Sequence, residues 1–160
     1  NLEYQKLKED MGNTSLSFHQ ILTLASIIEK EGVTDEDRKL ISGVFYNRMN
    51  NDMPLQSDIT VLYALGEHKE LVSIKDTEVD SPYNLYKHVG LGPGPYNSPS
   101  LSAIQAAIYP TASDYFYFVA DIETGNVYYA TTLEEHEALV AKYVNKNSSQ
   151  ESSVSSSQAE

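Results

Sequence analysis

Helical periodicity bounded by capping residues is the feature of this sequence that most restricts its fold. Ser15 or Ser17 precedes a segment whose apolar residues recur at helical spacing, and Gly32 follows that segment. Thr34 precedes a second segment of this kind, which begins with acidic residues at 35–37, where a helix dipole favours negative charge. The pattern therefore predicts two consecutive helices, the first ending at Gly32 and the second reaching about residue 49.

The rest of the chain predicts shorter elements. A loop over residues 50–58 leads into a short helix that ends at Gly66. Ser81-Pro82 and Ser98-Pro99 each resemble an N-cap followed by proline at the first helical position. They predict one helix that ends near Gly90 and another that runs to about Tyr109, where Pro110 stops it.

The last third of the chain predicts a hairpin and a helix. Residues 115–120 are a continuous apolar run with aromatics, which predicts a buried strand, and residues 127–130 return as its partner after Gly125. Thr132 and Glu135 form a capping box for a final helix that runs to about Asn145. The predicted fold class is α+β, mainly helical, with one β-hairpin.

Composition divides the chain into three parts. Residues 1–15 are polar and mixed in charge, which suggests a lead-in, and residues 16–146 contain all the predicted elements from Phe18 onward. Residues 147–160 are rich in serine and poor in apolar side chains, so they cannot bury enough surface to offset the entropy of ordering. We therefore expect a single domain at 16–146 followed by a disordered tail.

Charge and residue usage exclude several classes of function. The net charge of −12 argues against nucleic acid as a partner, because phosphate binding needs a basic surface. The chain has no cysteine, and its four histidines lack a paired metal-ligand spacing, so we expect neither a metal nor another cofactor. No apolar run reaches the roughly 20 residues of a membrane span, so we expect this chain to be soluble by itself.

Two acidic residues at the end of the first predicted helix are candidates for proton transfer. Glu29 and Glu31 project to opposite edges of its apolar face, whereas Lys30 points away from it. Burial beside the negative end of a helix would raise the pKa of a carboxyl group, as a general acid near neutral pH requires. Periodicity does not rank the two acids, and both could also be ordinary surface glutamates.

Two polar clusters stand at predicted loop–helix junctions. Their amide, hydroxyl and aromatic side chains can bind sugar hydroxyl and N-acetyl groups, although such residues are also common in caps and turns. The candidates in the first cluster are Gln56, Ser57 and Asp58, and those in the second are Tyr83, Asn84 and Tyr86.

Taken together, these segments resemble a known family, the YceG-like or MltG endolytic murein transglycosylases. Six stretches occur in the family's order and cover roughly residues 20–145, together with an acidic pair that precedes His136. They are LASIIEKEG (24–32), GVFYNRM (43–49), MPLQSDITVLYALG (53–66), SPYNLY (81–86), GLGPGPYNSPS (90–100) and YFYFVAD (115–121).

The resemblance implies a site and a reaction. Residues 16–146 would form a lysozyme-like catalytic domain that cleaves the β-1,4 bond between N-acetylmuramic acid and N-acetylglucosamine. The family's catalytic glutamate is the second acid of its Glu-Lys-Glu motif, which is Glu31 here. The six cluster residues named above would line the sugar cleft, with Asn47 and Arg48 as weaker candidates.

The resemblance also implies a cellular setting. Members of the family carry a single-pass membrane anchor and an N-terminal LysM-like domain, both absent from this sequence. The expected location is the extracytoplasmic face of the bacterial cell membrane. The expected partners are peptidoglycan glycan strands and proteins of cell-wall synthesis or division.

The sequence departs from the family pattern at two places. Ile59 follows Asp58 where the family usually has proline, and Ser57 stands in place of threonine. The usual Leu-Pro-Pro-Gly loop contains Gly92 in place of its first proline. These changes concern the shape of loops and leave the Glu-Lys-Glu motif intact.

A lytic transglycosylase needs one carboxyl group, whereas ordinary glycosidases use two. The acid protonates the glycosidic oxygen, and the same carboxylate then accepts the proton of the muramic acid C6 hydroxyl as that oxygen attacks C1. The product is a 1,6-anhydro sugar. Two alternatives remain open at this point: a muramidase-type hydrolase with Asp58 as second carboxylate, and a non-catalytic module that only binds glycan.

Overall fold

A computed structural model of the chain describes residues 2–69 and 71–144. These residues form two compact units, of which the first ends at Ser113 and the second begins at Asp114. The first unit contains α1 (Leu2–Asp10), η1 (Met11–Asn13), α2 (Phe18–Glu31), α3 (Asp35–Asn50), α4 (Asp58–Leu65), η2 (Asp76–Glu78) and α5 (Leu101–Ile108). The second contains β1 (Tyr117–Ala120), β2 (Val127–Ala130) and α6 (Leu133–Tyr143). The mainly helical α+β class with one hairpin is confirmed, and the single domain at 16–146 stays a prediction.

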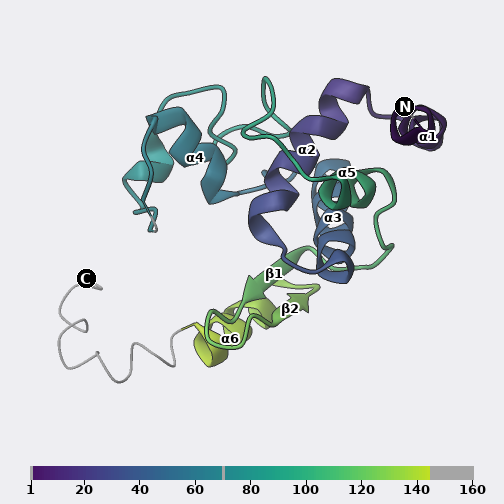
Figure 1. Ribbon diagram of the computed structural model, residues 1–160. Helices are drawn as coiled ribbons and strands as arrows, with labels where there is room; N and C mark the ends of the chain where they lie inside the picture. Colours follow the sequence, from purple (N-terminus) through teal and green to yellow (C-terminus); the bar gives the residue numbers. More distant parts are fainter. Residues whose placement is uncertain (1, 70, 145–160) are drawn as a thin grey trace, which may run out of the picture. The chain divides into compact units, whose positions relative to one another are not determined.

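Three helices form the core of the first unit. Helices α2, α3 and α5 pack against one another, and α4 lies on the other side of α2 from α5 (Figure 1). The small residues Ala103, Ala106 and Ala107 of α5 are buried, which lets this helix approach its neighbours closely. The large side chains of this core, all less than 2% exposed, are Ile21, Leu24, Ile27, Ile28, Ile41, Val44 and Phe45.

The predicted limits of α2 and α3 are confirmed. Ser17, rather than Ser15, caps α2 in a reciprocal capping box with Gln20, and Gly32 follows the last residue. Thr34 caps α3 by accepting a hydrogen bond from the backbone of Asp37. The predicted short helix that ends at Gly66 is α4, and Gly66 adopts the left-handed conformation that favours glycine there.

The polar lead-in is largely helical. The Tyr109 hydroxyl donates a hydrogen bond to Asp10 Oδ1 at 2.7 Å and accepts one from Asn13 Nδ2 at 3.2 Å, which ties the end of α1 and η1 to the end of α5. The hydrophobic pattern of the sequence did not predict α1. Charged residues are interspersed among the apolar residues of this helix, so no continuous apolar stripe marks its inner face.

The helix predicted after Ser81-Pro82 is wrong, since the segment forms turns. The Ser81 hydroxyl accepts from the backbone of Tyr83, two residues on, which is a local turn rather than a helix cap. The backbone of Leu85 is also committed elsewhere: its N–H donates to Thr60 Oγ1 and its carbonyl accepts from Gln56 N. If Leu85 lay within a helix, its N–H and carbonyl groups would form helical hydrogen bonds instead of these two bonds.

The helix predicted after Ser98-Pro99 exists but begins later. Helix α5 starts at Leu101 and its cap is Ser100, whose side chain accepts from the backbone of Ala103. The Ser100 backbone N–H and hydroxyl both donate to Glu29 Oε2, and this long-range contact determines which serine becomes the cap. The predicted end before Pro110 is confirmed.

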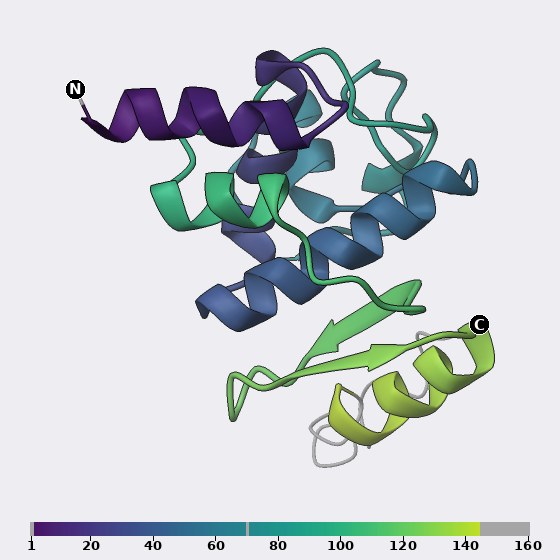
Figure 2. The ribbon, with the colours of Figure 1, turned by 90° about the vertical axis from the view of Figure 1, so that its right-hand side faces the viewer.

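The second unit is a hairpin with one helix against it (Figure 2). Strands β1 and β2 are antiparallel, with Tyr117 opposite Ala130, and Gly125 occupies the turn at φ +74°. The strand prediction is confirmed, but β1 is half-buried rather than buried, although α6 packs on this two-stranded sheet. Thr132 caps α6 as predicted.

The C-terminal predictions reach beyond the described part of the chain. Helix α6 ends at Tyr143, while Asn145 and the serine-rich segment 147–160 lie outside the described residues. Within the two described ranges, no helix is long and apolar enough to cross a membrane.

Candidate active site

Glu31, the last residue of α2, is held by one side chain of another element among the described residues. The Ser57 hydroxyl donates to Glu31 Oε1 at 2.8 Å. Burial of the Glu31 carboxyl group is the largest influence on its pKa and raises it, the Ser57 hydrogen bond lowers it, and the negative charge of Asp58 raises it. The net effect is a pKa above the ordinary value for glutamate, which suits a general acid.

Ser57 binds Glu31 instead of capping its own helix. It stands at the N-cap position of α4, yet its side chain makes no cap hydrogen bond with the described residues of that helix. A capping bond at this position is worth about 1 kcal/mol, so α4 gives up local stability while the hydroxyl serves Glu31. Ser57 is 2% exposed, so water competes little for this contact.

Glu29 occupies a different environment, although it is only two residues from Glu31. Its Oε2 accepts from the Ser100 hydroxyl at 2.6 Å and from the Ser100 N–H at 3.1 Å, and its Oε1 lies 3.7 Å from an Arg38 nitrogen. The Ser100 hydroxyl is the main cause of a lowered Glu29 pKa, with Arg38 contributing in the same direction. Glu29 thus joins α2 to α5 as a carboxylate, and the geometry separates the two acids that periodicity could not rank.

We expect Glu29→Gln to lower stability in a pH-dependent way. Hydrogen bonds to a charged group that is partly exposed give an expected loss of about 1 kcal/mol near pH 7. Because the folded pKa of Glu29 is lowered, this stabilisation is complete above the unfolded pKa and is lost as pH falls through the folded value. Urea unfolding at about pH 7 and about pH 3 measures the free energy of unfolding of wild type and of Glu29→Gln. The difference between the two proteins should be smaller at about pH 3 than at about pH 7.

Glu31→Gln is the matched control for stability. The pKa of Glu31 is raised in the folded state, so folding disfavours the ionised carboxyl group. Replacing this carboxyl group by an amide should therefore cost no stability near neutral pH. Equal losses of stability in Glu29→Gln and Glu31→Gln would contradict the different environments described for the two acids.

Tyr86 holds the carboxylate of Asp58, which begins α4. The Tyr86 hydroxyl donates to Asp58 Oδ1. Burial is the largest cause of a raised Tyr86 pKa, and the hydrogen bond to Asp58 raises this pKa further. The hydroxyl therefore stays protonated and remains a donor. Arg48 is 7% exposed and donates to the Pro54 carbonyl at 2.8 Å, within the loop that leads to α4. Glu31, Ser57, Asp58 and Tyr86 are called the Glu31 site below.

Two candidate sugar ligands make hydrogen bonds within the fold. Asn84 is fully buried, donates to the carbonyls of Thr77 and Val79 at 2.8 Å each, and accepts from Tyr86 N at 3.0 Å. Its amide therefore orients the turn that carries Tyr86 and does not face a ligand. Asn47 donates to the Ser113 carbonyl at 2.8 Å, which anchors the end of the first unit to α3.

Gln56, like Asp58, is an exposed member of the first polar cluster, whereas Ser57 is buried. Its φ of +56° lies in the left-handed region, which is uncommon for a residue with a side chain. The Gln56 N–H donates to the Leu85 carbonyl at 3.1 Å, so a cross-segment bond maintains this conformation. Backbone strain of this kind is frequent next to functional sites.

Three tyrosines pack against one another. Tyr83 packs on Tyr63 of α4 with ring centroids 4.8 Å apart, and both rings contact Tyr96. Sequence reasoning identified Tyr83 but missed Tyr63 and Tyr96. Two signals were available: the high tyrosine content, 12 residues against 4 phenylalanines, and the position of Tyr63 and Tyr96 within stretches shared with the family. Neither signal says which rings meet.

The segment from Pro93 to Ser100 is attached along one side of α2. His19 Nε2 lies 2.9 Å from the Pro93 carbonyl, Ser26 Oγ accepts from Tyr96 N at 3.0 Å, and Glu29 binds Ser100. Gly92, where the family usually has proline, adopts φ +78°, and a Cβ there would lie 2.4 Å from the Tyr96 hydroxyl. Proline cannot adopt this conformation, so the departure from the family pattern fits the path of this loop.

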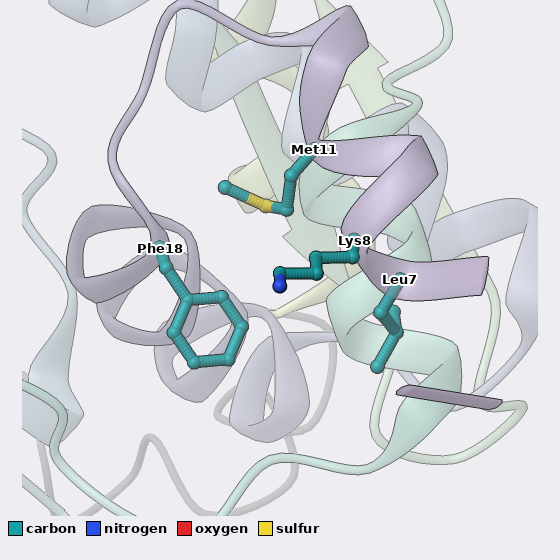
Figure 3. Close-up of a pocket in the computed structure, with 4 residues that line it drawn as sticks. All are labelled: Leu7, Lys8, Met11 and Phe18. Atoms are coloured by element: carbon teal, nitrogen blue, oxygen red, sulfur yellow. The ribbon is translucent and has the colours of Figure 1, made fainter. Parts of the chain in front are cut away.

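The described residues form no metal site, and an apolar pocket in this structure is not part of the Glu31 site. The described residues contain no group of three or more histidine, aspartate or glutamate side chains that could hold a metal ion. A pocket of about 280 Å³ lies between α1 and the start of α2, where Lys8 and Met11 point towards Phe18 (Figure 3). Its lining, completed by Leu7, contains no carboxyl group.

Comparison with known proteins places these features in one family. The sequence model of the YceG-like family matches residues 1–142. The chain is 52% identical over 91% of its length to a protein of Streptococcus pneumoniae strain R6, and 46% identical over 90% to one of Bacillus subtilis strain 168, both named endolytic murein transglycosylase. It spans 26% and 40% of these two relatives.

A solved structure shows the same fold. A crystal structure of a YceG-like protein from Listeria monocytogenes superposes with a TM-score of 0.82 and is 52% identical in sequence. The match covers 86% of this chain and 45% of that one.

Proposed function

This chain belongs to the YceG-like family, and on that premise we propose that it cleaves peptidoglycan glycan strands as an endolytic lytic transglycosylase. The observation that carries the proposal is the contrast between the two acids of the Glu-Lys-Glu motif. Glu31 has a raised pKa and one hydrogen bond from a serine hydroxyl, whereas Glu29 is committed to Ser100 and Arg38.

Glu31 performs both proton transfers in the proposed mechanism. Its protonated carboxyl donates to the glycosidic oxygen between N-acetylmuramic acid and N-acetylglucosamine as the bond to C1 breaks. The resulting carboxylate accepts the proton of the C6 hydroxyl of the same muramic acid while that oxygen bonds to C1. The products are a 1,6-anhydro end and a free N-acetylglucosamine 4-hydroxyl, and Glu31 is again protonated.

The neighbours of Glu31 assist this cycle. Ser57 fixes the carboxyl orientation through its 2.8 Å hydrogen bond, which also stabilises the carboxylate formed midway. The charge of Asp58 favours reprotonation of Glu31, and the Tyr86 hydroxyl holds Asp58 in place. Gln56 and Tyr83 are the remaining candidates for direct sugar contact, and Asn84 positions Tyr86.

The cellular setting is part of the proposal and is supported by the resemblance to the family. We propose that the protein acts at the extracytoplasmic face of the bacterial cell membrane through an anchored longer chain, together with proteins of cell-wall synthesis or division. Glycan strands of peptidoglycan are the proposed substrate.

The decisive experiment for the reaction class is incubation of the chain with purified sacculi, followed by mass spectrometry of the soluble products. We expect muropeptides with 1,6-anhydro ends. Products that carry one additional water would instead identify a hydrolase, with Asp58 as the candidate second carboxylate. Sedimentation of the chain with sacculi without any product would identify a glycan-binding module. Either of these two results would overturn the proposal.

A further inference from the structure

The three tyrosines Tyr63, Tyr83 and Tyr96, called the tyrosine cluster, differ in exposure. Tyr96 is 7% exposed, whereas Tyr63 is 46% exposed. Tyr96 meets the other two rings edge-on, at 5.4 Å from Tyr63 and 6.0 Å from Tyr83. Edge-to-face pairs of this kind stabilise a fixed ring geometry, so Tyr96 braces the two outer rings from beneath.

The hydroxyl groups of the cluster also differ. The Tyr96 hydroxyl donates to the Leu91 carbonyl at 3.1 Å. The hydroxyls of Tyr63 and Tyr83 make no hydrogen bond with any residue in the described ranges. A partly exposed ring that is braced from below and carries an uncommitted hydroxyl offers an apolar face and a polar tip together.

The cluster continues the Glu31 site along two segments of chain. Tyr63 follows Asp58 by five residues on α4, which is a displacement of about 7.5 Å along the helix axis. Tyr83 precedes Tyr86 by three residues in the turn fixed by Asn84. Five residues also turn the helix by about 140°, so the link between Tyr63 and the Glu31 site runs through the turn 83–86, where Tyr83 packs on Tyr63 and Tyr86 binds Asp58.

We propose that the tyrosine cluster is a saccharide-binding subsite for the glycan strand, separate from the bond that is cut. The C–H face of one pyranose ring packs on the Tyr63 ring, and the Tyr63 and Tyr83 hydroxyls bind its hydroxyl or N-acetyl groups. The inference rests on the proposed function, because that function identifies the bound polymer as a glycan strand. It adds a position at which a sugar away from the scissile bond is held.

A subsite of this kind predicts a change in substrate affinity without a change in chemistry. Tyr63→Ala should raise KM for isolated glycan strands by about three- to tenfold, the range expected for one aromatic contact, while kcat stays within about twofold. Tyr63→Phe keeps the ring and should show a smaller increase in KM. Tyr109→Ala is the matched control, because Tyr109 is 41% exposed but contacts α1 through Asp10.

Binding can be measured independently of turnover. Cosedimentation with purified sacculi in the Glu31→Gln background should show weaker retention when Tyr63→Ala is added, with thermal unfolding used to confirm that the variant is folded. Unchanged KM and unchanged retention in a folded Tyr63→Ala protein would overturn the subsite. A wild-type chain that releases no anhydro product would refute the proposed function instead, and the sedimentation result would still decide the subsite.

Discussion

Replacing Glu31 by glutamine is expected to lower the rate of anhydromuropeptide release by at least about 10⁴-fold. One positioned acid or base contributes about 10²- to 10⁴-fold, and Glu31 is assigned both roles in the same cycle. The amide of glutamine retains the size of the side chain and can still accept from the Ser57 hydroxyl. The loss would therefore report proton transfer rather than a collapsed site, and it can be measured by chromatography of products from purified sacculi.

Glu29→Gln is the matched control for this experiment. The two residues are the same amino acid, two positions apart on α2, and each accepts a hydrogen bond from a serine hydroxyl. Under conditions where both variants are folded, Glu29→Gln should keep activity within about tenfold of wild type, because Glu29 is assigned to stability and acts on catalysis only through α5 packing. Loss of activity in Glu29→Gln with near-normal turnover in Glu31→Gln would reverse the assignment.

Replacing Ser57 by alanine has the second largest expected effect on activity. Loss of a hydrogen bond to a charged group costs about 1.5–3 kcal/mol, which corresponds to a decrease of about 10- to 100-fold in kcat/KM. The substitution should also alter the pH profile. The Ser57 hydrogen bond lowers the Glu31 pKa, so its removal raises that pKa further.

The direction of the pH effect follows from the first step. The free enzyme needs protonated Glu31, so activity falls as pH rises through the Glu31 pKa, and in Ser57→Ala this fall should move to higher pH. Ser57→Thr, which restores the residue usual in the family, should keep the hydroxyl, the activity and the original profile. A slower Ser57→Ala enzyme whose profile has not moved would show that the hydroxyl acts only through packing.

Local signals in the sequence were sufficient for the helices that carry the site. Ser17, Gly32 and Thr34 mark the ends of α2 and α3 because capping depends on residues within one turn. The Ser81-Pro82 prediction failed for the opposite reason. In that segment the backbone groups of Leu85 bind Gln56 and Thr60, which are 29 and 25 residues away, and no local pattern contains such partners.

The same limit applies to the candidate site. Projection placed Glu29 and Glu31 symmetrically about the apolar face. The burial of Glu31 and the distant partners, Ser57 for Glu31 and Ser100 with Arg38 for Glu29, distinguish them. Resemblance to the family selected Glu31, and the structure provides a physical reason that agrees with that choice. Asn84 illustrates the converse, since its amide looked available in the sequence but is used entirely within the fold.

The central claim is that one carboxyl group, Glu31, cuts the glycan strand without using water. Digestion of purified glycan strands in water enriched in heavy oxygen tests this claim most directly. If Glu31 directs the C6 hydroxyl onto C1, mass spectrometry will find 1,6-anhydro ends that contain no heavy oxygen. If the new ends are reducing sugars that carry heavy oxygen at C1, water is the nucleophile and the single-carboxyl mechanism is wrong.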